Sequence, residues 1–143
     1  MTADRVRAIA EEYWDAKLEA SPLFASYLGD HRFDDRADDM SAEAERRLRD
    51  RWQSIRERAA AIPTDELDDT AAVTRDLLIG ELDDAIRGID LRRVELESDQ
   101  MQGAHAGLLI MAGQLRAPEP EHARMAVTRV GELARLLDQA AQR

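Results

Sequence analysis

The sequence predicts an all-α protein, an irregular bundle of about five to six helices with one short extended segment. Apolar residues recur at three- and four-residue steps through most of the chain, and serine, glycine and proline stand where these runs begin or end. Only one stretch alternates with a period of two, and a lone strand cannot form a sheet. Because the 143 residues are 44% apolar and contain no internal repeat or linker, we expect a single helical domain over 1–143.

The N-terminal region is predicted to form two helices followed by a loop. Residues 4–18 carry the stripe of an amphipathic helix. Ser21 is a candidate N-cap, Pro22 suits the first helical position, and Gly29 is placed to end a short second helix. The polar stretch 30–40 then connects this helix to the next.

The third and fourth helices have the clearest boundaries. Ser41 is expected to cap the third helix and Pro63 to end it. Thr64 restarts the chain, and the fourth helix fades near Gly88, with acidic residues near its N-terminal dipole. The residues expected to face the core are Leu48, Trp52, Ile55, Ala59 and Ile62 in the third helix and Val73, Leu77, Leu82, Ile86 and Ile89 in the fourth.

The C-terminal region begins with a break in the helical period. Residues 91–101 alternate apolar and charged side chains, which predicts an extended segment that could pair with another chain. A short apolar helix is expected through 108–111, and Pro118 and Pro120 mark a loop before the last helix. The chain ends without a glycine or proline stop signal, which we interpret as a truncated or split protein. The stripe expected on the last helix is Met125, Val130, Leu133, Leu136 and Leu137.

Composition and charge exclude several classes of function. The absence of cysteine rules out disulfides, thiol nucleophiles and Cys-based zinc sites. A net charge of −10 disfavours nucleic acid, and the charged N-terminus and lack of a long apolar run disfavour a signal peptide or a membrane, so we expect a cytoplasmic protein. Residues 64–84 hold eight acids and one base, which indicates a solvated helix face or a surface that docks a basic partner.

No catalytic or metal-ligating motif is found in the sequence. The histidines lack the His-Glu-x-x-His spacing that lets two side chains four residues apart reach one zinc ion. Glu119-x-x-His122 matches one element of a di-iron bundle, but Pro120 lies inside it and no second copy exists, so we interpret it as a helix start. Trp14 and Trp52 lie on helix stripes and are expected in the core, and His105 is interpreted as a polar cap.

The densest polar cluster lies in the loop between the second and third helices. Its arginines could bind a carboxylate and its aspartates a hard cation, although the calcium-loop pattern of an EF-hand is missing. The structural alternative is a loop held by its own Asp–Arg pairs and Asx turns, with Phe33 inserted into the core. The candidate substrate- or ligand-contacting residues are Asp30, His31, Arg32, Asp34, Asp35 and Arg36.

Several short blocks resemble the bacterial domain-of-unknown-function family 885. The specific block is Leu-Gly-Asp-His-Arg-Phe-Asp-Asp-Arg at 28–36, followed by Asp-Met-Ser at 39–41. Further similar blocks are Glu-Tyr-Trp (12–14), Pro22, Asp-Leu-Leu (76–78) with Glu-Leu (81–82), Gln-Met-x-Gly (100–103) and Arg-Leu-Leu-Asp-Gln (135–139). The resemblance spans essentially the whole chain.

The resemblance implies the N-terminal helical part of a larger fold similar to zinc metallopeptidases. Longer members carry a His-Glu motif that is absent here, so no catalytic residue and no metal ligand carries over, and zinc is expected only in a longer member. The function we expect is a non-catalytic wall of a substrate cleft, with a missing C-terminal catalytic portion or a second polypeptide as partner and a homo-oligomer as a further option. The alternatives are a free-standing helical adaptor domain and a small metal-independent enzyme that uses His31 and carboxylates.

Overall fold

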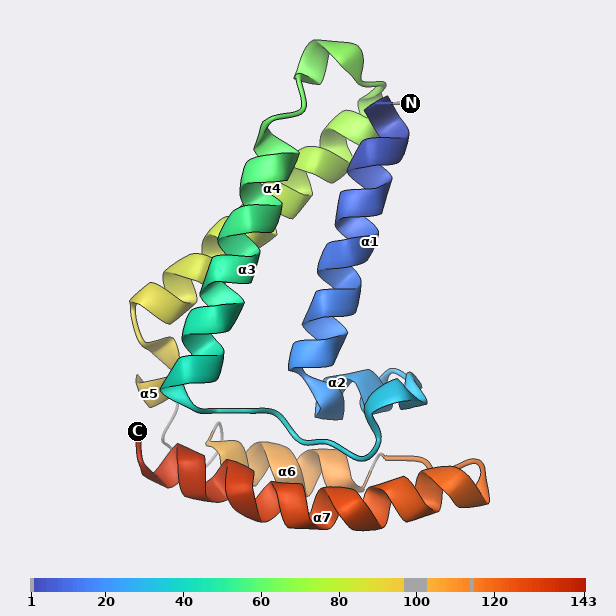
Figure 1. Cartoon of the computed structure of the whole chain (residues 1–143), viewed down its shortest axis with the longest axis vertical. Coiled ribbons are helices and arrows are strands. Elements are labelled where there is room, and N and C mark those ends of the chain that lie inside the picture. Colours follow the sequence, from blue (N-terminus) through green and yellow to red (C-terminus); the bar gives the residue numbers. More distant parts are fainter. Residues whose placement is uncertain (1, 97–102, 114) are drawn as a thin grey trace. The chain divides into compact units, whose positions relative to one another are not determined.

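The computed structural model describes residues 2–96, 103–113 and 115–143, and these residues form helices and turns with no strand (Figure 1). This confirms the all-α prediction. None of the helices in the described residues is both long and apolar enough to cross a membrane. In chain order the elements are α1 (Thr2–Ala20), α2 (Pro22–Tyr27), η1 (His31–Phe33), α3 (Ala42–Ala60), η2 (Thr64–Glu66), α4 (Asp69–Asp90), α5 (Arg93–Leu96), α6 (Ala104–Ala112) and α7 (Pro120–Ala141).

The chain divides into two compact units, each built from two separate stretches of sequence. Unit 1 comprises Met1–Lys17 and Glu45–Arg93, which supply most of α1 and α3 together with α4. Unit 2 comprises Leu18–Ala44 and Val94–Arg143, which supply α2, the following loop, α6 and α7. The expectation of a single domain stays a prediction.

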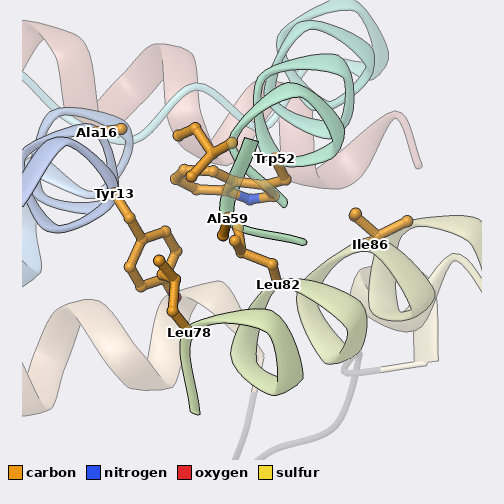
Figure 2. Packing of buried hydrophobic residues seen from close by; sticks show 8 residues of the cluster. Tyr13, Ala16, Trp52, Ala59, Leu78, Leu82 and Ile86 are labelled. Atoms are coloured by element: carbon orange, nitrogen blue, oxygen red, sulfur yellow. The ribbon is translucent and has the colours of Figure 1, made fainter. Parts of the chain in front are cut away.

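Unit 1 is organised around large apolar side chains from α1, α3 and α4 (Figure 2). The Tyr13 ring meets the Trp52 ring edge to face, with centroids 5.2 Å apart. Leu82 is fully buried between the helices, and Ile55 is 1% exposed. Burying side chains of this size stabilises a fold by roughly 1.5–3 kcal/mol each. The buried members of this core are Tyr13, Ala16, Trp52, Ile55, Ala59, Leu78, Leu82 and Ile86.

Ion pairs connect the helices of unit 1 around this core. Arg56 Nε lies 2.7 Å from Asp83 Oδ1, which joins α3 to α4. Arg58 Nη2 lies 2.6 Å from Glu12 Oε1, which joins α3 to α1, and this pairing lowers the pKa of Glu12. Such exposed pairs contribute at most about 1 kcal/mol each, so the apolar core dominates the stability of this unit.

Unit 2 has a much smaller set of buried apolar residues. Leu23, Ala37 and Leu136 are buried together. They come from α2, the loop after it and α7, and α6 adds partly buried Leu108 and Met111. This core alone contains little large apolar surface, so polar contacts are needed to fix the loop.

The second helix begins at Pro22 as predicted, but its capping side chain and that of α4 differ from the predicted ones. Ser41 caps α3 as expected, through its Oγ and the amide of Ala44. The Ser21 side chain makes no cap hydrogen bond at α2. Instead Asp38 binds the Ser21 hydroxyl and accepts the amide of Leu23, so the loop supplies the acceptor. Thr64 begins a short 3-10 turn, and Asp68 provides the actual cap of α4.

The predicted extended segment 91–101 is wrong where it can be compared. Residues 93–96 form the helical turn α5, which follows a break at Arg92, where φ is +52°. A short chain reversal with a positive φ interrupts the helical period without producing a strand. Residues 97–102, the rest of that prediction, lie outside the described part of the chain.

Several residues assigned to the core are exposed because the buried faces are rotated from the predicted ones. In α1 the buried positions are Val6, Tyr13, Ala16 and Leu18, which leaves Trp14 45% exposed, whereas Trp52 is buried as predicted. In α4 the buried face runs through Ala71, Leu78, Leu82 and Ile86. The predicted core residues that prove exposed are Trp14, Val73, Leu77, Val130 and Leu137.

Candidate functional site

The Asp30–Arg36 loop begins with a tight reversal at the end of α2. Gly29 has a φ of +87°, a conformation that favours glycine, and it ends the helix as the sequence predicts. Asp30 then caps η1 by accepting the amide of Arg32 at 3.1 Å. The Arg32 guanidinium lies 2.7 Å from the same carboxylate and, with these hydrogen bonds, lowers the pKa of Asp30. The start of the loop is therefore held by a local Asx turn and ion pair.

Asp34 is the buried centre of the loop, with only 3% of its surface exposed. Its Oδ2 lies 2.7 Å from Nδ1 of His31, one turn earlier. Its Oδ1 accepts a hydrogen bond from the Ser26 hydroxyl on α2 and lies 3.5 Å from the Arg129 guanidinium on α7. A buried carboxylate needs such partners because an unpaired charge is expensive away from water.

Arg129 joins the loop to α7 and is itself 3% exposed. Its Nε donates to the carbonyl of Arg36 at 2.6 Å, and its Nη2 donates to the carbonyl of Phe33 at 2.7 Å and to Ser26 Oγ at 2.7 Å. Burial lowers the pKa of Arg129, and the nearby carboxylates, Asp34 first, oppose that shift. One guanidinium thus satisfies backbone acceptors of the loop and faces its buried carboxylate.

The second half of the loop lies along the C-terminal half of α7. Gln139 Nε2 donates to Asp39 Oδ1 at 2.9 Å, and the amide of Met40 donates back to Gln139 Oε1 at 3.0 Å. Arg135 lies 3.6 Å from the same aspartate. Burial raises the pKa of Asp39, but hydrogen bonds from Ser41 and Gln139 outweigh it and the net pKa is lowered. Two blocks that carry the family resemblance, 39–41 and 135–139, therefore contact each other.

Asp38 is a partly exposed residue whose carboxylate lies in a strongly desolvating environment. It accepts the amide of Leu23 at 3.3 Å at the start of α2. Burial raises its pKa, and the hydrogen bonds from Leu23 and Ser21 and the charge of Arg129 only partly offset this. Ionised Asp38 therefore carries a net electrostatic penalty in the folded protein.

His122, in the first turn of α7, stacks on His31 with ring centroids 4.4 Å apart. Its Nδ1 is buried and has no hydrogen-bond partner among the described residues. The Glu119-x-x-His122 sequence is a helix start, as predicted, with Pro120 at the first position of α7. The stack adds an apolar ring contact between η1 and α7.

The six candidate residues form three pairs, and the third pair lies at the surface. Asp30 binds Arg32, and His31 binds Asp34. Arg36 Nε is 3.9 Å from Asp35 in an exposed pair. Phe33 is only partly buried, and the guanidinium groups of Arg32 and Arg36 lie over its ring at 5.1 and 5.6 Å from its centroid. The Asp–Arg pairs and Asx turn of the structural alternative are thus present, and ligand contact stays a prediction.

Sequence reasoning missed Arg129, the residue that joins the loop to α7. The buried face of α7 runs through His122, Met125, Arg129, Leu133 and Leu136, at steps of three and four. The sequence signal for it was an arginine at the centre of a mostly apolar stripe. It indicates a buried charge that requires an acceptor-rich partner, although it does not identify the partner.

The described residues do not provide the ligand set of a catalytic metal. No three histidine, aspartate or glutamate side chains in the described ranges lie together as metal ligands would. His31 uses Nδ1 to bind Asp34, and Asp34 is shared with Ser26 and Arg129.

Comparison with known proteins gives one family. The family described as "Bacterial protein of unknown function (DUF885)" matches residues 22–143. The chain belongs to this family. No curated protein and no solved structure matches the chain. In this DUF885 chain the match covers the polar loop, Arg129 and all of α7, which are the parts that form the cluster described above.

Proposed function

We propose that this DUF885 chain is the non-catalytic helical portion of a metallopeptidase-like hydrolase, where it forms a structural wall or one side of the substrate cleft. The partner in this proposal is a catalytic portion carried elsewhere, on the same or a second polypeptide. The proposal rests on the family resemblance and on one observation about α6.

That observation is that α6 is apolar on every side. Its sequence, Ala-His-Ala-Gly-Leu-Leu-Ile-Met-Ala, has one polar residue. Leu108 and Met111 pack into unit 2, while Leu109 is 79% and Ile110 is 61% exposed. A helix that is apolar all round is normally buried on all sides, and large apolar patches on a monomer mark interaction sites. The outer face of α6 therefore supports a role as a covered wall.

The polar loop supports the same role. Asp34 and Arg129 are engaged with each other and with neighbouring groups, which favours positioning of the loop over proton transfer. Asp35 and Arg36 keep exposed side chains at the surface of unit 2. In this proposal they are the loop residues that reach the substrate cleft or the catalytic portion.

The test is binding of a hydrophobic dye by the full chain, with light scattering to follow self-association. We expect dye binding or association, reduced by the double change Leu109→Gln and Ile110→Gln. Leu77→Gln is the matched control, because Leu77 is 65% exposed but lies on α4 in unit 1. A monodisperse chain that binds no dye, or a loss of binding equal in the control, would contradict the proposal.

A second candidate, a free-standing helical adaptor domain, is favoured by a groove in unit 1. The groove lies between α1 and α4 and includes exposed Trp14. An adaptor should unfold in a cooperative transition as the isolated chain, since it needs no catalytic portion to complete its fold. Loss of structure without a sharp transition would argue against this candidate.

A further inference from the structure

A groove of about 960 Å³ lies in unit 1 between α1 and the N-terminal part of α4. Its floor includes Val6 and Ala71, which are 2% and 7% exposed. Trp14 also lines it and exposes 45% of its surface. This volume lies at the upper end of the range of small binding sites, roughly 300–1,000 Å³.

Trp14 is the unusual residue of this groove. Tryptophan is enriched among residues that dominate binding energy, because its ring buries a large apolar area with few rotatable bonds. Here the ring lies beside the apolar floor instead of in the core, where Trp52 is found. Lys17 Nζ lies 5.9 Å from the Trp14 ring centroid, so this aromatic ring already accepts a cation.

The rim of the groove is acidic. Among its lining residues four carboxylates, Glu11, Asp15, Asp68 and Asp69, accompany a single guanidinium, Arg7. Asp68 accepts the amide of Ala71 at 2.8 Å, so it also caps the positive N-terminal end of α4. The acidic rim therefore favours a positively charged occupant. Charges at the rim of an interface mainly set the specificity and the rate of association.

We propose that this groove docks a basic amphipathic helical segment of a partner protein. Apolar side chains of that segment would cover the Trp14 ring and the floor, while its lysines or arginines would face the carboxylates of the rim. A second copy of this chain is disfavoured, because its net charge is −10. The proposal does not rest on the hydrolase hypothesis, because it concerns unit 1 alone.

The test uses the full chain and a fluorescein-labelled synthetic peptide of leucine and lysine in amphipathic helical order. Fluorescence anisotropy would measure binding, and the same peptide with glutamate in place of lysine would be the probe control. We expect the basic peptide to bind, its affinity to fall with added salt, and the acidic peptide not to bind.

Variants then locate the binding surface. Trp14→Ala should weaken binding at least about tenfold, as expected for an anchor residue. Asp69→Asn should weaken it roughly two- to fivefold at low salt, as expected for a rim charge. Two matched controls should change it less than about twofold: Leu77→Ala, an exposed apolar residue of α4, and Asp65→Asn, an acidic residue of the same stretch. Neither control residue lines the groove.

Three results would overturn the proposal. Equal losses in the control variants would indicate nonspecific attraction to an acidic protein. Displacement of the peptide by butylammonium at the concentration at which the peptide binds would assign the groove to a small cation. Light scattering that showed a dimer abolished by Trp14→Ala would assign it to a second copy of the chain.

Discussion

The two units of this protein fix their helices in different ways. Unit 1 surrounds Trp52, Leu82 and other large apolar side chains with helices, and its ion pairs lie at the surface. Unit 2 buries few large apolar residues and instead places a guanidinium and a carboxylate, Arg129 and Asp34, inside. Apolar burial is nondirectional, whereas a buried ion pair requires each partner in place. Unit 2 should therefore depend on single residues more than unit 1 does.

The largest expected effect is at Arg129. Arg129→Met keeps an unbranched aliphatic stem but removes the guanidinium, which leaves Asp34 without its buried counter-ion and the carbonyls of Phe33 and Arg36 without their donor. Breaking a buried pair in this way should lower the free energy of unfolding by about 3–5 kcal/mol. Urea denaturation would measure the loss, and hydrogen exchange should rise first in the loop and α7.

The companion variant Arg129→Lys sharpens this prediction. A lysine keeps the positive charge, but it lacks the planar guanidinium that donates to the carbonyls of Arg36 and Phe33 and to Ser26 Oγ together. It should recover only part of the stability. Loss of less than about 1 kcal/mol in Arg129→Met would show that this pair does not set the stability of unit 2.

A second prediction concerns the apolar unit. Leu82→Ala should lower the free energy of unfolding by about 2–5 kcal/mol, because Leu82 is 0% exposed and its truncation leaves a cavity. Leu77→Ala, on the same helix but 65% exposed, should change it by less than about 0.5 kcal/mol. Exchange protection should fall mainly in unit 1. Similar effects of the two substitutions in thermal or urea denaturation would mean that the described core face of α4 is incorrect.

The same contrast explains which parts of the fold were predictable from sequence. The start of α3 at the Ser41 cap and the end of α2 at Gly29 depend on neighbouring residues, so local chemistry determines them. The buried face of α4 was predicted correctly at Leu82 and Ile86 but wrongly at Val73 and Leu77, because apolar residues occur on more than one side of this helix. Val73 and Leu77 are as apolar as Leu78 and Leu82, and only packing against α1 and α3 distinguishes them.

The candidate site divides in the same way. The pairs Asp30–Arg32 and His31–Asp34 join residues two and three positions apart, and the cluster was visible as a polar loop. The Arg129–Asp34 pair joins residues 95 positions apart, and one sequence gives no means to match them. Long-range charge pairing therefore stayed beyond prediction even though each residue, taken alone, was unusual.

The third and smallest expected effect is a pH dependence centred on Asp38. Its pKa is raised from the ordinary value of 3.8, chiefly by burial, so the folded state binds a proton more readily than the unfolded state. As pH rises from 3.8 through the raised pKa of folded Asp38, the stability of unit 2 falls. Above that raised pKa the stability falls no further. Asp38→Asn removes this charge and keeps an oxygen for the amide of Leu23. It should therefore be more stable than the unmodified chain near pH 7.

The difference in stability between Asp38→Asn and the unmodified chain should vanish below about pH 3.8, where Asp38 is protonated in both the folded and the unfolded chain. Asp38→Ala is the control, because it removes the hydrogen-bond acceptor together with the charge. At low pH Asp38 is uncharged, so removing it relieves no electrostatic penalty, and the free energy of unfolding should fall by about 1 kcal/mol. Urea denaturation from pH 3 to 7.5 would separate the two. If Asp38→Asn followed the unmodified chain at every pH, the burial of Asp38 would carry no electrostatic cost.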